Sequence, residues 1–298
     1  MILRGSRFLL AILLFLIAAG ALPARAGAPE EWNVQWEPAN LVNGSPVLFL
    51  IRAPQGLREL RGNFLGQGVS FRMGQACHCW YGIAGVSLST QPGQYTLRLE
   101  GVSASPEKAT LAYVVPVGAA HYPATTIKVA PQFVAPPKET LARIEEDQAI
   151  KKQAFATTLP EALWLGRFQP PAQAEVSGVF GSARVFNGVK KSQHTGIDFR
   201  VTTGTPIHAT NAGTVVLARS LYFEGNCVTL DHGQGLMSLY MHLSEIKVKE
   251  GDKVESGQLL GLSGGTGRAT APHLHFALRW HGEYLDPGTL LQLKPPQN

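Results

Sequence analysis

The sequence predicts a mainly β chain with an N-terminal Ig-like β-sandwich, a helical linker and a C-terminal compact antiparallel β-sheet domain. Hydrophobic residues occupy 45% and charged residues 16% of the 298 positions, which is typical of a globular protein. The 32 glycines and 20 prolines favour short strands joined by turns over long helices. Strand-like runs lie on both sides of one proline-framed segment, which holds the single helical candidate.

Residues 1–26 are typical of an export signal. Arg4 and Arg7 precede an apolar run from Phe8 to Leu22, and Ala24-Arg25-Ala26 matches a small-x-small cleavage site. The apolar run is shorter than the ~20 residues that span a bilayer comfortably, and no cysteine follows it for lipid attachment. After cleavage of the signal we therefore expect a periplasmic or secreted protein that is not an integral membrane protein.

Removal of residues 1–26 lowers the formal net charge from +5 to +2, because this segment holds three arginines and no acidic residue. A mildly basic exported protein explains that charge without a nucleic acid partner. We therefore expect no binding to nucleic acid.

Residues 27–118 are predicted to form the β-sandwich. Two of its strands are the runs SPVLFLIRA and GQYTLRLEGV, and Pro92-Gly93 marks a turn before the second. Apolar and polar side chains alternate from Tyr95 to Glu100, as in a strand with one buried face. No cluster of catalytic residue types lies in this region, which favours a binding or positioning role.

The three cysteines leave at least one thiol unpaired. An exported chain can keep disulfides. The CHC motif formed by Cys77, His78 and Cys79 lacks a second ligand pair nearby, so a structural or disulfide role is favoured over metal binding. Cys227, in the apolar run NCVTL, is expected to be a small buried hydrophobic residue.

Residues 119–175 are expected to be a linker with one helix, from Lys138 to Ala156. Prolines frame this helix, and the Asp147/Lys151 pair has the i,i+4 spacing that supports a solvent-exposed helix. Autoinhibition by the helix is a second interpretation, and a solvated linker is the favoured one.

Strand signals return in residues 176–290, before a tail at 291–298. The first run, VSGVFGSARVFNG, ends in Asn187-Gly188, a strong hairpin turn pair. Five more runs follow, with no amphipathic helix between them: GTVVLARS, NCVTLDHG, GLMSLYMHLSEI, QLLGLSG and HLHFALRW. This pattern disfavours βαβ units and predicts a compact antiparallel β-domain.

The stretch HTGID places His194 and Asp198 four residues apart. In an extended strand such residues stand ~13 Å apart, which is too far for two ligands of one zinc ion. The chain must therefore bend between them if they share a metal, and Gly196 lies where a bend is permitted.

The stretch PHLHFALRW offers a third ligand. At a period of two, His273 and His275 lie on one face of a strand, and Leu274, Phe276 and the alternate residues after them form an apolar face. Each motif alone is a weak signal, but their conjunction in one chain predicts a metal site.

Residues Val176 to Pro287 resemble the lysostaphin- or LytM-type zinc metallopeptidases, which cut peptidoglycan cross-links. The resemblance rests on FNGVKKSQHTGIDF, GTPIHATNAGTVV, GNCVTLDHGQGLMSLYMHLS, VKEGDKVESGQLLGLSGGTGRATAPHLHF and YLDP. It implies that residues 176–290 form a zinc metallopeptidase domain. Residues 40–115 also look like the small β-sandwich that precedes this domain in some Gram-negative members.

The resemblance implies roles for five residues. His194, Asp198 and His275 would bind Zn²⁺. His273, the first histidine of HLH, and His242 in YMHLS would be the catalytic histidines.

One position departs from the family pattern. The glycine that commonly precedes Pro-His-Leu-His is Ala271 here. If this backbone needs a positive φ, alanine would strain it.

The chemistry agrees with these roles. Two imidazoles and one carboxylate leave the fourth position of zinc open for water, whose pKa the metal lowers to about 7. No HExxH glutamate is present to handle the proton, and His242 and His273 are suitable because imidazole titrates near neutrality. The sequence leaves open which of them is the base. The remaining histidines are expected to be structural or at the surface: His78, His121, His208, His232 and His281.

The leading hypothesis is an exported zinc endopeptidase that hydrolyses amide bonds in peptidoglycan peptides. The alternative is a non-catalytic regulator that activates a cell-wall amidase, as some relatives without metal ligands do, and the complete ligand set favours the enzyme. A non-haem iron oxygenase also uses two histidines and a carboxylate, but with a closely spaced HxD that is absent here. Peptidoglycan is the expected substrate and a regulatory protein a possible partner. The bond cleaved, a diaminopimelate-type or a glycine-containing cross-link, is left open.

Overall fold

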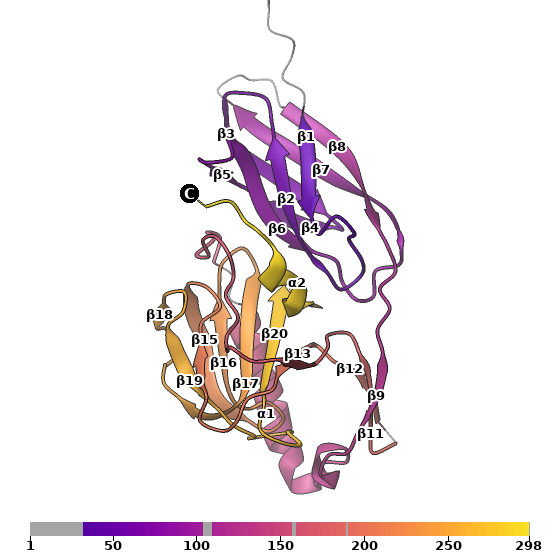
Figure 1. Cartoon of the computed structure of the whole chain (residues 1–298), viewed down its shortest axis with the longest axis vertical. Coiled ribbons are helices and arrows are strands. Elements are labelled where there is room, and N and C mark those ends of the chain that lie inside the picture. The colour runs from indigo at the N-terminus through magenta and orange to yellow at the C-terminus, as the bar shows by residue number, and fades with distance from the viewer. Residues whose placement is uncertain (1–31, 104–108, 157–158, 189, 298) are drawn as a thin grey trace, which may run out of the picture.

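A computed structural model describes residues 32–103, 109–156, 159–188 and 190–297 (Figure 1). The predicted signal at 1–26 lies outside these residues. Within them no helix has both the length and the apolar character to cross a membrane. The prediction of a mainly β chain with antiparallel sheets is confirmed, since strands dominate residues 33–117 and 176–285.

The N-terminal region contains two four-stranded antiparallel sheets, ordered β1-β2-β6-β5 and β4-β3-β7-β8. Phe49 of the first sheet and Phe64 of the second meet edge to face, 5.3 Å apart, in a core that both sheets share. An Ig-like topology stays a prediction. The strands are β1 (Asn33–Glu37), β2 (Pro46–Arg52), β3 (Leu57–Phe64), β4 (Gln67–Ser70), β5 (Arg72–Gly74), β6 (Cys79–Gly85), β7 (Gly93–Ser103) and β8 (Ala109–Val117).

The alternation in β7 has the expected cause. Leu97 and Leu99 are buried in the shared core, whereas Arg98 and Glu100 between and beyond them are exposed. Near this core Cys77 and Cys79 form a disulfide, and Cys227 is a buried free thiol in the C-terminal domain.

The C-terminal region is built on an antiparallel sheet in the order β10-β13-β20-β17-β16-β15-β18, to which β14, β19 and β21 attach. The apolar face of β20 supplies Leu274 and Phe276 to its core, both fully buried. The elements are β10 (Val176–Gly178), β13 (Gly196–Phe199), β14 (Pro206–His208), β15 (Gly213–Leu221), β16 (Gly225–Asp231), β17 (Leu236–Ile246), β18 (Lys253–Val254), β19 (Leu259–Ser263), β20 (Leu274–Trp280), β21 (Glu283–Leu285) and α2 (Pro287–Gln292).

A separate three-stranded sheet joins the connector to the C-terminal region. β11 (Ala183–Phe186) and β12 (Lys190–Gln193) form the hairpin that Asn187-Gly188 predicts, and both turn residues have positive φ. On its other edge β11 pairs in parallel with β9 (Ala124–Ile127). The connector thus contributes a strand that the sequence did not reveal.

The connector helix is docked on the C-terminal domain, contrary to the expectation of a solvated linker. After the 3₁₀ turns η1 (Pro131–Phe133) and η2 (Lys138–Thr140), α1 (Leu141–Ala156) packs against β15. The predicted Asp147/Lys151 pair is not what stabilises it. Asp147 is buried and accepts a hydrogen bond from the Tyr222 backbone, and Lys151 pairs with Glu224.

The N-terminal sheets pack directly on the C-terminal domain. Gly85 at the end of β6 lies against Leu285 and Trp280, so closely that a Cβ there would be 2.4 Å from a Leu285 methyl group. The Asp286 N–H donates to the Gly44 carbonyl across this contact. The predicted tail at 291–298 begins inside α2, and its Leu293 is buried in the same core.

Candidate active site

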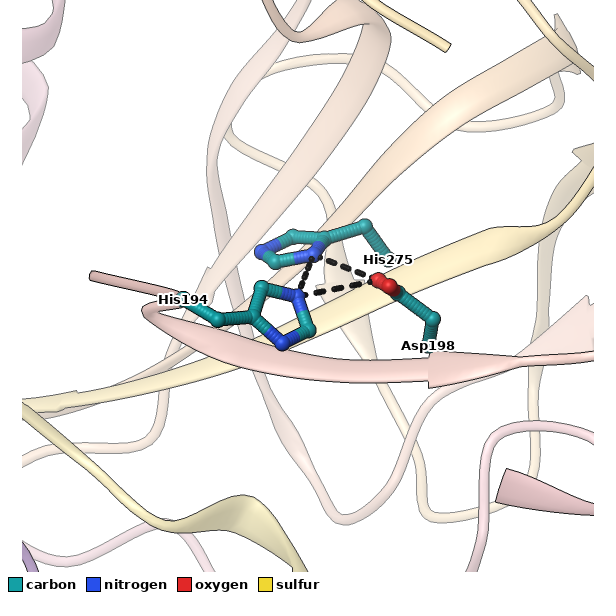
Figure 2. A group of neighbouring side chains, drawn as sticks. All are labelled: His194, Asp198 and His275. Carbon is teal, nitrogen blue, oxygen red and sulfur yellow. Dashed lines mark hydrogen bonds and ion pairs between the residues drawn. The ribbon is translucent and has the colours of Figure 1, made fainter. Parts of the chain in front are cut away.

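Three of the predicted site residues converge on one point (Figure 2). Asp198 on β13 and His275 on β20 are cross-strand neighbours, which places their side chains together on one face of the sheet. His194 precedes β13 and reaches the same point from the loop after β12. All three side chains are buried.

The donor atoms of these side chains form a small triangle. His194 Nε2 lies 3.1 Å from Asp198 Oδ1 and 3.0 Å from His275 Nδ1, and His275 Nδ1 lies 2.9 Å from Asp198 Oδ1 (Figure 2). In a tetrahedral zinc site with bonds of ~2.0–2.2 Å, neighbouring ligand atoms are about 3.3–3.5 Å apart. A triangle of two imidazole nitrogens and one carboxylate oxygen therefore fits a zinc ion with little movement. In the described part of the chain this is the one cluster of potential metal ligands.

Neighbouring groups orient the triangle. His194 Nδ1 donates to the Val179 carbonyl at 2.8 Å, which leaves its Nε2 lone pair facing the site. Arg184 on β11 lies 2.5 Å from Asp198 Oδ2, so that Oδ1 is the oxygen that faces the histidines. Burial raises the pKa of Asp198, but its contacts with the His194 and His275 rings outweigh burial and hold the pKa well below its usual range.

Gly196 has a different purpose from the predicted bend. It lies within β13 and does not adopt a positive φ. A Cβ at this position would lie 2.4 Å from the Phe276 carbonyl oxygen and 2.8 Å from His275 Nε2. The glycine is therefore needed as space for the neighbouring strand and for the His275 ring.

His242 and His273 lie beside the triangle, with ring centroids 4.8 Å apart. Their Nδ1 atoms donate to the carbonyls of Thr266 and Ala271, each at 2.8 Å, so Nε2 is the free nitrogen of both rings. His273 Nε2 is 3.8 Å from Asp198 Oδ1. Burial and the neighbouring His275 and His273 rings lower the pKa of His242 to about 3.

The backbone at His242 is unusual. Its φ is +64°, a left-handed conformation that few residues other than glycine adopt. Such conformations cost of order 1–3 kcal/mol and persist where surrounding contacts impose them. Ala271, in contrast, has no positive φ, so the expected strain at the Gly-to-Ala departure is absent.

The comparisons with known proteins agree with this geometry. The model of peptidase family M23 matches residues 192–287, which include all five predicted site residues. The chain contains an M23 peptidase domain. The resemblance seen in the sequence is thereby confirmed.

The matches with relatives of the M23 domain span only a part of each relative's length. Peptidoglycan DD-endopeptidase ShyA of Vibrio cholerae serotype O1 is 42% identical over 113 residues, 38% of this chain and 26% of ShyA. Lysostaphin of Staphylococcus simulans is 46% identical over 91 residues, 30% of this chain and 18% of lysostaphin. A Pseudomonas aeruginosa structure solved as a candidate M23 peptidase matches more widely, with a TM-score of 0.63 and 29% identity over 84% of this chain and 94% of that one.

A cleft of about 360 Å³ opens over His194, Asp198 and His275, the candidate metal ligands, which we call the M23 site. His242 and His273 line it together with the metal-site residues, and Arg200 and Arg268 add positive charge. Ile127 and Val129 of the connector form part of one wall. The connector thus borders the site, a feature for which the sequence carried no local signal.

The histidines predicted to be structural stay outside the M23 site. His232 is fully buried, donates from Nδ1 to the Ala212 carbonyl and has Nε2 2.7 Å from Ser238 Oγ. Burial lowers its pKa to about 4. Sequence reasoning missed Arg184 and the carbonyls that fix the ring tautomers, because such contacts depend on pairing between distant segments.

Proposed function

We propose that this chain is an exported zinc-dependent endopeptidase that hydrolyses amide bonds in peptidoglycan peptides. One observation carries the proposal: two imidazole nitrogens and one carboxylate oxygen lie within 3.1 Å of each other in an M23 domain, beside two further histidines. Relatives of the domain are named peptidoglycan DD-endopeptidases and a glycyl-glycine endopeptidase, which supports a peptidoglycan peptide as substrate.

His194, Asp198 and His275 would hold the metal. Zinc supplies Lewis-acid chemistry when bound, polarising a carbonyl and acidifying a water molecule. Arg184 keeps one oxygen of Asp198 occupied, so a single carboxylate oxygen is presented to the metal. The Val179 carbonyl keeps His194 in the tautomer that can act as a ligand.

His242 and His273 would move the proton. In each ring a main-chain carbonyl binds Nδ1–H, which leaves Nε2 to accept a proton from water or to donate one to the leaving amine. Burial lowers the pKa of His242 and so keeps its ring neutral at neutral pH. We leave the division of labour between the two histidines open.

The cleft suits a peptide with carboxylate groups. Arg268, which is half-buried, and the exposed Arg200 line it, and guanidinium groups bind carboxylates through charge-assisted hydrogen bonds. Peptidoglycan stem peptides carry such groups. Export, which the signal-like residues 1–26 suggest, would bring the protein to this substrate.

The test is the products released from purified peptidoglycan by the mature chain, with and without a metal chelator. We expect cross-linked muropeptides to disappear, and chelation to prevent this. Unchanged cross-linking in the presence of zinc, together with stimulation of a cell-wall amidase, would instead support the regulator alternative.

A further inference from the structure

The connector helix α1 binds one turn of the C-terminal domain through a hydrogen bond and an ion pair. This turn, residues 222–224, joins β15 to β16. Asp147 Oδ2 accepts a hydrogen bond from the Tyr222 backbone N–H at 2.7 Å, and Lys151 Nζ lies 2.5 Å from Glu224 Oε1. The acceptor Asp147 and the donor Lys151 are four residues apart on α1 and therefore lie on one face of the helix, which contacts both ends of the 222–224 segment.

A second part of the connector covers the same turn. The Phe133 ring packs at a tilt against the rings of Tyr222 and Phe223, with centroids 5.6 and 6.4 Å apart. The Tyr222 hydroxyl donates to the Gln132 carbonyl at 3.1 Å. The 222–224 turn therefore contacts two parts of the connector, both of which lie outside the M23 match.

On its other side the 222–224 turn holds His242. The Glu224 carbonyl accepts the His242 backbone N–H at 2.9 Å. Gly225, the next residue, lies against Thr266, whose carbonyl accepts the His242 Nδ1–H. The turn thus supports both the left-handed backbone of His242 and the loop that orients its ring.

The Lys151–Glu224 pair is partly buried, with 25% and 15% of the two side chains exposed. Glu224 lines the cleft, and its Oε2 has no hydrogen-bond partner among the described residues. A partly buried carboxylate that loses a cationic partner is disfavoured and moves toward water. Loss of Lys151 should therefore displace the turn that carries the His242 contact.

We propose that Lys151 and Glu224 are positioning residues through which the connector helix fixes His242 in its left-handed conformation. The connector then helps to position an active-site residue, in addition to joining the two domains. This inference rests on the proposed function for the role of His242, but its structural half can be tested without turnover.

The experiment uses the full mature chain with zinc bound and compares Lys151→Met with Lys152→Met. Lys152 is the exposed neighbour on the same helix and serves as the matched control. The measurements are kcat and KM on peptidoglycan, zinc affinity, and the ring carbon–proton NMR signal of His242, assigned from its loss in His242→Gln.

We expect Lys151→Met to shift the His242 signal and to lower kcat about tenfold, because small misplacements of a catalytic group cost 10–100-fold. KM and zinc affinity should stay near wild type, Lys151→Arg should restore both the signal and kcat, and Lys152→Met should change nothing. If Lys151→Met does not fold, Glu224→Gln tests the same ion pair.

Two results would overturn the inference. One is an unshifted His242 signal with wild-type kcat in Lys151→Met, and the other is a rise in KM alone, which would indicate substrate binding. If the wild-type protein leaves peptidoglycan intact, the proposed function fails, and the NMR signal still decides whether the connector positions His242.

Discussion

Arg184 contacts one oxygen of the Asp198 carboxylate and leaves the other oxygen facing the two histidines. The guanidinium lies 2.5 Å from Oδ2, whereas Oδ1 faces His194 and His275 at 3.1 and 2.9 Å. Arg184 comes from β11, which pairs with the connector strand β9, so the orientation of the Asp198 carboxylate depends on a segment outside the M23 match.

Replacement of this arginine should weaken metal binding. We expect Arg184→Met to lower zinc affinity by about 10–100-fold, the usual effect of removing a group that orients a ligand. A zinc competition titration measures this, with Arg61→Ala on the N-terminal sheet as the control, since Arg61 is an exposed residue that pairs with Glu59. Equal zinc affinity in Arg184→Met and wild type would show that Asp198 needs no such partner.

The space at Gly196 predicts a steric effect. In Gly196→Ala the added methyl group would meet the Phe276 carbonyl and the His275 ring, and overpacking of this kind costs about 1–3 kcal/mol of unfolding free energy. Zinc affinity should fall as well, because the His275 ring must move. Denaturant unfolding checks the first effect, with Gly68→Ala, which has open space around it, as the control. Gly196→Ala with wild-type stability and zinc affinity would refute the packing argument.

His232 predicts a pH dependence of stability away from the metal. Burial lowers its folded pKa from 6.5 to about 4, so the unfolded chain binds a proton more readily. Its contribution is therefore fully present above pH 6.5 and is lost as the pH falls toward 4, by about 3 kcal/mol in unfolding free energy. Denaturant unfolding at pH 7, 5.5 and 4 should show a shallower decline in His232→Gln than in wild type. Parallel declines would contradict the prediction.

The contact between the N-terminal sheets and the M23 domain predicts coupled unfolding. Leu285 is fully buried against Gly85, and Leu285→Ala should lower the free energy of unfolding by about 2–5 kcal/mol. Because the core is shared, signals from both regions should shift to lower temperature together. Leu141→Ala at the exposed start of α1 is the control and should change the unfolding free energy by less than about 0.5 kcal/mol. Separate transitions in wild type would show that the two regions unfold independently.

The sequence identified what is local and chemical. Strand periodicity predicted β7 and β20, and two short histidine motifs predicted the three residues that meet at the candidate metal site, because residue type and spacing are written directly into such motifs. The Asn187-Gly188 pair predicted its hairpin for the same reason.

What the sequence did not reveal depends on contacts between distant segments. The Asp147/Lys151 spacing suggested a solvated helix, but each side chain has a partner near residue 222 instead. Gly196 was interpreted as a bend, whereas its true constraint is a neighbouring strand some eighty residues away in the chain. Neither partner can be read from local pattern, because the fold brings it close only after the sheet has formed.

The most direct measurement compares wild type with Asp198→Asn, both shown to be folded, on purified peptidoglycan in the presence of zinc. The quantity followed is the rate at which cross-linked muropeptide dimers become monomers. We predict hydrolysis by wild type and a rate about 10³-fold lower in Asp198→Asn, since metal activation supplies several kcal/mol of barrier lowering. Equal rates in the two proteins would contradict a metal-dependent peptidase at this site.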